Sequence, residues 1–192
     1  MSKATDHETV SIYPHSEEQK QELMTRAPEC VLMWGTKDHW PVGVVHSFVW
    51  HDEKVWVTFA AQRHRGSAIK RDPRVSVCVS GRTSDDPKCP MGAVTIKGRA
   101  TFHDDRETKE WFYRALSKKS FPTDPDGEQS FYDLLDSPLR TLISIEPEKW
   151  ISFDAEKSQR HRAGTLSEDE LGKPLSADTT RLDQEKQRRG MS

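Results

Sequence analysis

Most apolar positions of the chain fall in short runs separated by polar turns, which is the pattern of β-strands. Val42 to Trp50 is rich in β-branched and aromatic residues, residues 51–54 are polar, and Val55 to Phe59 forms a second such run. Two runs joined by a short polar turn predict a β-hairpin. Val75 to Val79 alternates apolar and polar residues, which predicts a strand with one buried face. Further strands are predicted at residues 30–34, 93–102, 141–145 and 150–153.

Helical patterns occur between these runs. Ser16 and Gln19 form a capping-box sequence before a predicted helix at Glu17–Arg26. Other helices are predicted at Ser67–Arg71, after Asp104 or Asp105, and near Gln129–Leu135. Six to seven strands with few long helices favour an antiparallel barrel over a doubly wound sheet. No Gly-rich turn opens a helix directly after a strand, so a Rossmann site has no support.

The composition divides the chain into an ordered part and a solvated part. Only 33% of the 192 residues are hydrophobic, whereas 31% are charged. Residues 154–192 contain no aromatic residue, and charges of both signs alternate through them. Such a segment cannot bury enough apolar surface to offset its chain entropy. The sequence therefore predicts an N-terminal arm and helix at 1–27, a barrel domain at 28–153, and a charged tail at 154–192 that is mobile or ordered only against a partner subunit.

Net charge and cysteine content indicate the cellular compartment of the protein and the partners it does not bind. A net charge of −2 argues against a general nucleic-acid binder, which would carry a basic excess. No run approaches the roughly 18 apolar residues that span a bilayer, and residues 1–7 are too polar for a secretory signal. The three cysteines are an odd number without paired spacing, which is typical of reduced thiols. We expect a cytoplasmic protein without a nucleic-acid or membrane partner.

One segment combines several groups that bind anions. Residues 58–67 leave a strand, collect Arg63, His64 and Arg65, and enter a short helix at Ser67. Arginine offers a planar fork of donors that matches phosphate oxygens, and a helix N-terminus favours anions. This pattern indicates a site for a phosphorylated ligand, although a solvated basic loop has the same composition. The chain has neither a Cys-x-x-Cys nor a His-Glu-x-x-His motif, so no zinc site is predicted.

The order of these residues resembles a known signature. Residues 55–58, followed by residues 63–77 with an Asp-Pro-Arg at 72–74, are similar to the core of the pyridoxamine 5'-phosphate oxidase-like, FMN-binding split-barrel family. Residues 41–47 resemble the strand that lies along the flavin ring in that family. Residues 94–100 resemble its Val-x-x-x-Gly-x-Ala strand, and residues 145–149 its Pro-containing turn. The resemblance covers roughly residues 28 to 153.

The resemblance implies a mainly β fold, a six- to seven-stranded antiparallel split barrel with a few peripheral helices. It also implies a homodimer with FMN at the subunit interface. Arg65 matches the family's phosphate-binding arginine, and Gly66 stands where the family usually has lysine. The implied cofactor-binding residues are Val44, Val45, His46, Ser47, Val57, Thr58, Arg63, Arg65, Gly66, Ser67 and Lys70.

The function implied is an FMN-dependent oxidoreductase acting on a small molecule. No lysine occurs near Ser47, where the true oxidase holds its substrate, and the oxidase's C-terminal arginine motif is absent. Pyridoxamine-phosphate oxidation is therefore not expected. Two alternatives remain: a deazaflavin-dependent reductase on the same barrel, and a flavin or haem carrier without turnover. Trp50, at the hairpin end, either packs in the core or covers a ligand, and Lys118 and Lys119 are predicted to be solvated.

Overall fold

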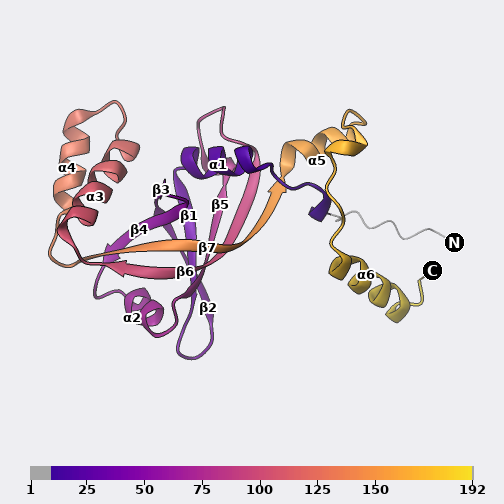
Figure 1. The fold of residues 1–192 in the computed structure, drawn as a ribbon, viewed down its shortest axis with the longest axis horizontal. Coiled ribbons are helices and arrows are strands. Elements are labelled where there is room, and N and C mark those ends of the chain that lie inside the picture. Colours follow the sequence, from indigo (N-terminus) through magenta and orange to yellow (C-terminus); the bar gives the residue numbers. More distant parts are fainter. Residues whose placement is uncertain (1–9, 192) are drawn as a thin grey trace.

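The computed structural model describes residues 10–191, so the first nine residues of the predicted N-terminal arm and Ser192 lie outside the described range. Seven strands form one antiparallel sheet in the order β2-β1-β5-β6-β7-β4-β3. The sheet curls into an open half-barrel (Figure 1), so the predicted split barrel is confirmed. The strands are β1 (Glu29–Gly35), β2 (Pro41–Ser47), β3 (Val49–His51), β4 (Lys54–Ala60), β5 (Arg74–Ser80), β6 (Gly92–His103) and β7 (Arg140–Asp154).

Helices lie at the edges of this barrel (Figure 1). A Ser16–Gln19 capping box starts the first of them, as the sequence predicts. The α-helices are α1 (Glu17–Arg26), α2 (His64–Arg71), α3 (Arg106–Ser120), α4 (Pro125–Leu135), α5 (Ala155–Arg162) and α6 (Ser176–Arg188). Three short 3-10 turns are η1 (Val10–Ile12), η2 (Gly81–Thr83) and η3 (Glu168–Glu170). No helix within residues 10–191 is both long and apolar enough to cross a membrane.

β4 separates two clusters of buried side chains. Val55, Val57 and Phe59 face the barrel core, where they pack with residues of β1, β5 and β6. Trp56, on the opposite face, packs with the buried faces of α3 and α4. The middle of β4 is therefore buried on both faces, which explains why its sequence is nearly continuous in apolar residues.

The structure corrects the boundaries of four predicted elements. The strand predicted at Val42–Trp50 is broken at Phe48, whose side chain is completely buried. The chain leaves β1 at this point, and β3 pairs with β4 instead. The last two predicted strands are one strand, β7, with an irregularity opposite Lys97 and Gly98. Helix α2 begins at His64, three residues before the predicted start.

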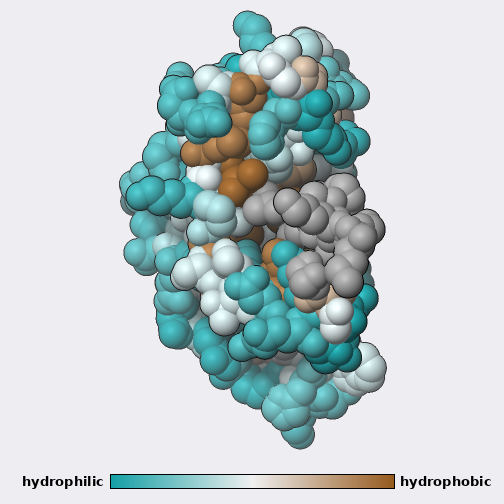
Figure 2. Space-filling view, turned by 90° about the vertical axis from the view of Figure 1, so that its right-hand side faces the viewer, coloured by the Kyte–Doolittle hydropathy of each residue, from teal (hydrophilic) through white to brown (hydrophobic). Residues whose placement is uncertain are grey.

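The segment after the barrel contains two helices. Asp154 is buried and caps α5 by accepting a hydrogen bond from the Lys157 backbone N–H at 2.9 Å. The Tyr13 hydroxyl lies 2.7 Å from Nδ1 of His161, which links α5 to the N-terminal segment. In contrast, α6 buries no residue. Figure 2, which faces this end of the molecule, shows a mainly hydrophilic surface with a narrow hydrophobic strip.

Candidate functional site

The sheet leaves two backbone edges without a strand partner. Within the described residues, β2 pairs only with β1. β3 covers β4 only from Lys54 to Trp56, so residues 57–60 of β4 pair with β7 alone. Unpaired N–H and C=O groups at a sheet edge can bind a ligand or another chain. These two edges mark the opening of the barrel, and they contain four of the residues predicted to contact a cofactor: Val44, Val45, Val57 and Thr58.

Arg65 links the elements around this opening. Its Nη1 atom lies 2.7 Å from Nε2 of His46, which joins α2 to β2. The guanidinium carbon lies 5.6 Å from the ring centroids of both Trp34 in β1 and Phe59 in β4. A guanidinium on an aromatic face gains a cation–π attraction. Arg65 is therefore held by an aromatic platform, which sequence reasoning missed because Trp34 and Phe59 are distant in the chain.

The contact fixes the protonation state of His46. A guanidinium only donates hydrogen bonds, so Nε2 of His46 accepts and the ring proton lies on Nδ1. Burial, and then the charge of Arg65, lower the pKa of His46 to about 4. Burial, and then the charge of Arg63, also lower the pKa of Arg65 from its usual value, which still leaves the guanidinium charged at neutral pH. The opening therefore holds a neutral imidazole beside a cation.

The N-terminal part of α2 carries positive charge without a negative partner. Arg63 is the N-cap residue and provides no side-chain cap. Among the ion pairs of residues 10–191, none joins a carboxylate to Arg63, Arg65, Lys70 or Arg71. Arg63 and Arg65 lie at the helix N-terminus, where uncompensated positive charge attracts anions, whereas Lys70 and Arg71 lie in the last turn.

The remaining predicted residues of α2 differ in what they can contribute. The Ser67 hydroxyl donates to the backbone oxygen of His64 at 3.0 Å, so its oxygen can still accept a hydrogen bond. The Nζ atom of Lys70 lies 5.2 Å from the ring centroid of Phe102 in β6, away from the elements that Arg65 contacts. A Cβ at Gly66 would lie 3.2 Å from the Ala61 carbonyl oxygen, so a lysine here would crowd the turn.

The residues of β2 and β4 differ in which of their atoms a ligand could contact. Val44 and His46 are half-buried on one face of β2, while Ser47 and Val45, which is 57% exposed, lie on the other. Val57 is completely buried, so only its backbone can reach a ligand. The Thr58 hydroxyl already donates to the Thr141 carbonyl oxygen at 2.8 Å. The structure thus brings His46 and Arg65 into contact, whereas Val57 and Thr58 provide backbone groups.

Ser47 borders a cavity that is also lined by Lys119, a residue that the sequence predicts to be solvated. Ser47, Arg26 and Lys119 are among the residues that line it. Nζ of Lys119 is buried, has no hydrogen-bond partner in the described structure, and lies 4.1 Å from the Phe48 ring centroid. Burial lowers the pKa of Lys119 to about 8. The prediction that Lys119 is solvated is therefore wrong: it follows Phe112 and Leu116 at helical spacing, on the buried face of α3.

The amino-acid sequence matches the model of a known protein family. The family model described as pyridoxamine 5'-phosphate oxidase matches residues 16–154. No curated protein sequence matches the chain.

Several solved structures share the fold. The conserved hypothetical protein Rv2991 from Mycobacterium tuberculosis has a TM-score of 0.63 at 17% identity, covering 92% of this chain and 99% of that one. An F420 reductase has a TM-score of 0.52 at 19% identity, covering 71% and 98%. The haem storage protein HutZ from Vibrio cholerae has a TM-score of 0.55 at 17% identity, covering 73% and 97%. The extent of the family match shows that the chain belongs to the pyridoxamine 5'-phosphate oxidase family.

Proposed function

We propose that the protein binds FMN at the opening between β2 and β4 and acts as an FMN-dependent oxidoreductase on a small molecule. The observation that carries this proposal is the cluster of arginines without carboxylate partners at the start of α2, next to two unpaired strand edges. The phosphate of FMN is a dianionic group that such a cluster can hold. When bound, FMN supplies the redox chemistry, while the protein supplies binding and orientation.

The described residues suggest a division of roles. Arg63 and the first N–H groups of α2 hold the phosphate together with the N–H groups of Arg65 that His46 does not use, and Ser67 joins them when its hydroxyl turns from the His64 carbonyl oxygen to the phosphate. The backbone of Val57 and Thr58 and residues 44–47 line the ring. His46, neutral and with its proton on Nδ1, is a hydrogen-bond donor toward the ring or the substrate. We expect Lys70 to contribute through its charge, because its Nζ lies over Phe102.

We also propose that the protein is a cytoplasmic homodimer with the cofactor at the interface between subunits. The unpaired edge of β2 and the exposed side chain of Val45 are the features that a partner would cover. A stable interface should bury more than about 1,000 Å². Light scattering of the flavin-loaded protein at micromolar concentration should give twice the mass of the chain. A monomer under these conditions would contradict the dimer.

The alternatives use the same opening with other cofactors. The F420 reductase and the haem storage protein share this fold. A haem-ligating His46 would have to release Arg65 from Nε2 or use Nδ1, so its contact with Arg65 favours a flavin over haem. We therefore keep deazaflavin and haem, including a carrier without turnover, as outcomes of the test.

Absorption and titration distinguish these outcomes. Purified protein with bound flavin should absorb near ~450 nm, whereas haem would give a Soret band. Apoprotein should bind FMN more tightly than riboflavin, because only FMN carries the phosphate. Failure to bind either flavin, or equal affinity for both, would overturn the assignment of FMN. Turnover is then tested by reducing the bound flavin and screening small-molecule acceptors: reoxidation that no candidate accelerates would favour the carrier.

A further inference from the structure

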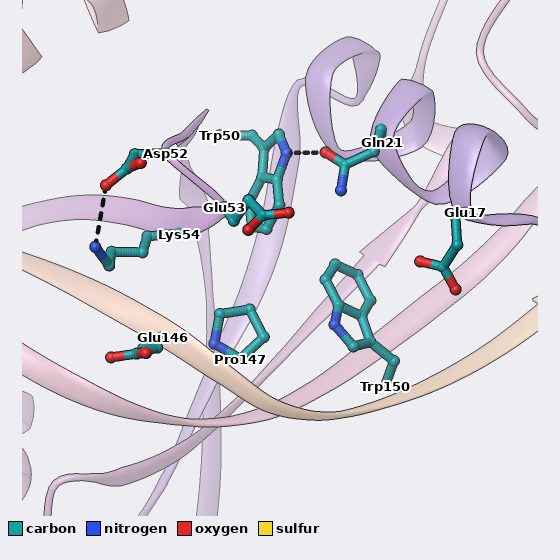
Figure 3. A pocket seen from close by; sticks show the side chains of 9 residues that line it. All are labelled: Glu17, Gln21, Trp50, Asp52, Glu53, Lys54, Glu146, Pro147 and Trp150. Atoms are coloured by element: carbon teal, nitrogen blue, oxygen red, sulfur yellow. Dashed lines mark hydrogen bonds and ion pairs between the residues drawn. The ribbon is translucent and has the colours of Figure 1, made fainter.

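A cavity separate from the cofactor site lies between α1, the β3–β4 turn and β7 (Figure 3). It encloses about 340 Å³, within the usual range for small-molecule pockets. Lys54, at the start of β4, lines this cavity, whereas α2 follows the other end of β4. Ligand binding in this cavity therefore does not depend on the flavin.

Two tryptophans form the aromatic walls of the cavity. The Trp50 and Trp150 ring centroids lie 5.8 Å apart with an interplanar angle of 81°. Nε1 of Trp50 donates a hydrogen bond to Oε1 of Gln21 at 2.6 Å, which fixes the orientation of that indole (Figure 3). Trp50 was predicted either to pack or to cover a ligand, and its half-buried ring at a cavity wall allows both.

The wall formed by Trp150 already stabilises a cation. Nζ of Lys20 lies 5.3 Å from the Trp150 ring centroid. Indole is the best of the aromatic side chains for cation–π attraction. Trp150 also lines the cavity, next to the Trp50 ring.

The carboxylates around the cavity are not all neutralised. Glu17 pairs with Lys20, and Asp52 pairs with Lys54 at 3.1 Å. Glu53 and Glu146 also line the cavity (Figure 3), and neither forms an ion pair within residues 10–191. The cavity therefore has an excess of negative charge. No group of three or more His, Cys, Asp and Glu side chains in the described part of the chain could hold a metal ion, so this charge does not form a metal site.

We propose that this cavity binds a small organic cation, an amine or quaternary ammonium group. The cation lies against the indoles of Trp50 and Trp150, and the carboxylates of Glu53 and Glu146 compensate its charge. Aromatic walls and carboxylates together favour an organic cation over both a neutral apolar ligand and an anion. Because most residues that line the cavity are polar or charged and it is open to solvent, we expect recognition of the charged head rather than of one whole molecule.

The test titrates the full-length protein with choline while tryptophan fluorescence is recorded at constant ionic strength. A parallel titration uses the uncharged isostere of choline in which carbon replaces nitrogen. Choline should bind at least about tenfold more tightly than the isostere, because only the cation gains the cation–π and charge terms. Equal affinity for the two compounds, or no saturable binding of choline, would overturn the proposal.

Charge variants locate the binding. The double variant Glu53→Gln/Glu146→Gln should weaken choline binding about tenfold and leave the isostere unchanged. Glu18→Gln is the matched control, because Glu18 is exposed on α1 and does not line the cavity. Since Glu53 and Glu146 are both exposed, circular dichroism should show a native fold for the double variant. Unchanged choline affinity in the folded double variant would show that the cation binds elsewhere.

Discussion

The two ends of β4 carry opposite charges. After Ala60 the chain enters α2, where arginines and a lysine have no carboxylate partner. Before Lys54 the turn carries Asp52 and Glu53, and Glu146 of β7 lies beside it at the same cavity. Between these ends the middle side chains of β4 are buried on both faces and the Thr58 hydroxyl is already bonded, so only the unpaired backbone edge of residues 57–60 is open to a ligand. Charged side chains that a ligand can reach therefore lie at the two ends of the strand, beyond its buried middle.

The aromatic residues at the two ends differ in the same way. Phe59 is only 2% exposed and belongs to the barrel core, although Arg65 rests on it. Trp50 is half-buried and borders a cavity. The first ring supports both the fold and the proposed cofactor site, whereas the second is partly free to contact a ligand. This difference can be measured by comparing the free energy of unfolding of variants at the two positions.

Truncating these two rings should change the free energy of unfolding more than any other variant considered below. Phe59→Ala should lower the free energy of unfolding by about 3–5 kcal/mol, because it removes a fully packed side chain. Trp50→Ala should cost less than Phe59→Ala, although the indole is larger, since one side of it faces the cavity. Urea denaturation of the two variants provides the comparison. An equal or larger loss in Trp50→Ala would show that Trp50 is a core residue rather than a cavity wall.

A smaller effect should appear in the pH dependence of stability. The pKa of His46 is lowered to about 4 in the folded state, against about 6.5 when unfolded. The unfolded chain therefore takes up a proton first as pH falls, so this contribution is complete above pH 6.5 and is lost towards pH 4. His46→Gln should reduce the loss over this interval by about 1–2 kcal/mol.

Part of the dependence of stability on pH should remain in that variant. His15 is buried, and burial lowers its pKa as well, so the loss of stability towards acid pH should shrink rather than vanish. Chemical denaturation at a series of pH values measures both profiles. Parallel curves for wild type and His46→Gln would contradict the neutral, buried state of His46.

The smallest effect should follow from removing residues 173–192. This truncation deletes α6, which buries no side chain, and leaves α5 and its contact between His161 and Tyr13 intact. We expect the free energy of unfolding to change by less than about 0.5 kcal/mol, as for other exposed segments. FMN and choline binding should both be unchanged. A larger loss of stability would mean that α6 packs against the barrel or against a partner subunit.

The sequence predicts local features better than contacts between distant elements. The capping box at Ser16, the hairpin after Trp50 and the alternation in β5 follow from neighbouring residues, and the structure shows all three. The predicted start of α2 at Ser67 is three residues too late. The structure instead begins the helix after a turn in which the Arg63 N–H donates to the Ala60 carbonyl oxygen, without a side-chain cap.

The candidate site shows the same limit. The resemblance selected both His46 and Arg65, but nothing in their separate motifs indicates that they contact each other. The platform of Trp34 and Phe59 depends on how β1 and β4 curl around one core. Lys119 was missed because charge suggests exposure, whereas its position on α3 determines its burial. Residue types predict which groups are available, and the tertiary fold decides which of them meet.

Binding of the cofactor's phosphate at α2 is tested by a fluorescence titration of apoprotein with FMN and with riboflavin. Arg65→Ala should weaken FMN binding about ten- to a hundredfold, since a charge-assisted hydrogen bond contributes roughly 1.5–3 kcal/mol. Riboflavin, which lacks the phosphate, should bind wild type and variant almost equally. Arg65→Lys should recover part of the loss, and Arg63→Ala is the matched neighbouring variant. Equal FMN affinity in wild type and folded Arg65→Ala would show that Arg65 does not bind the phosphate.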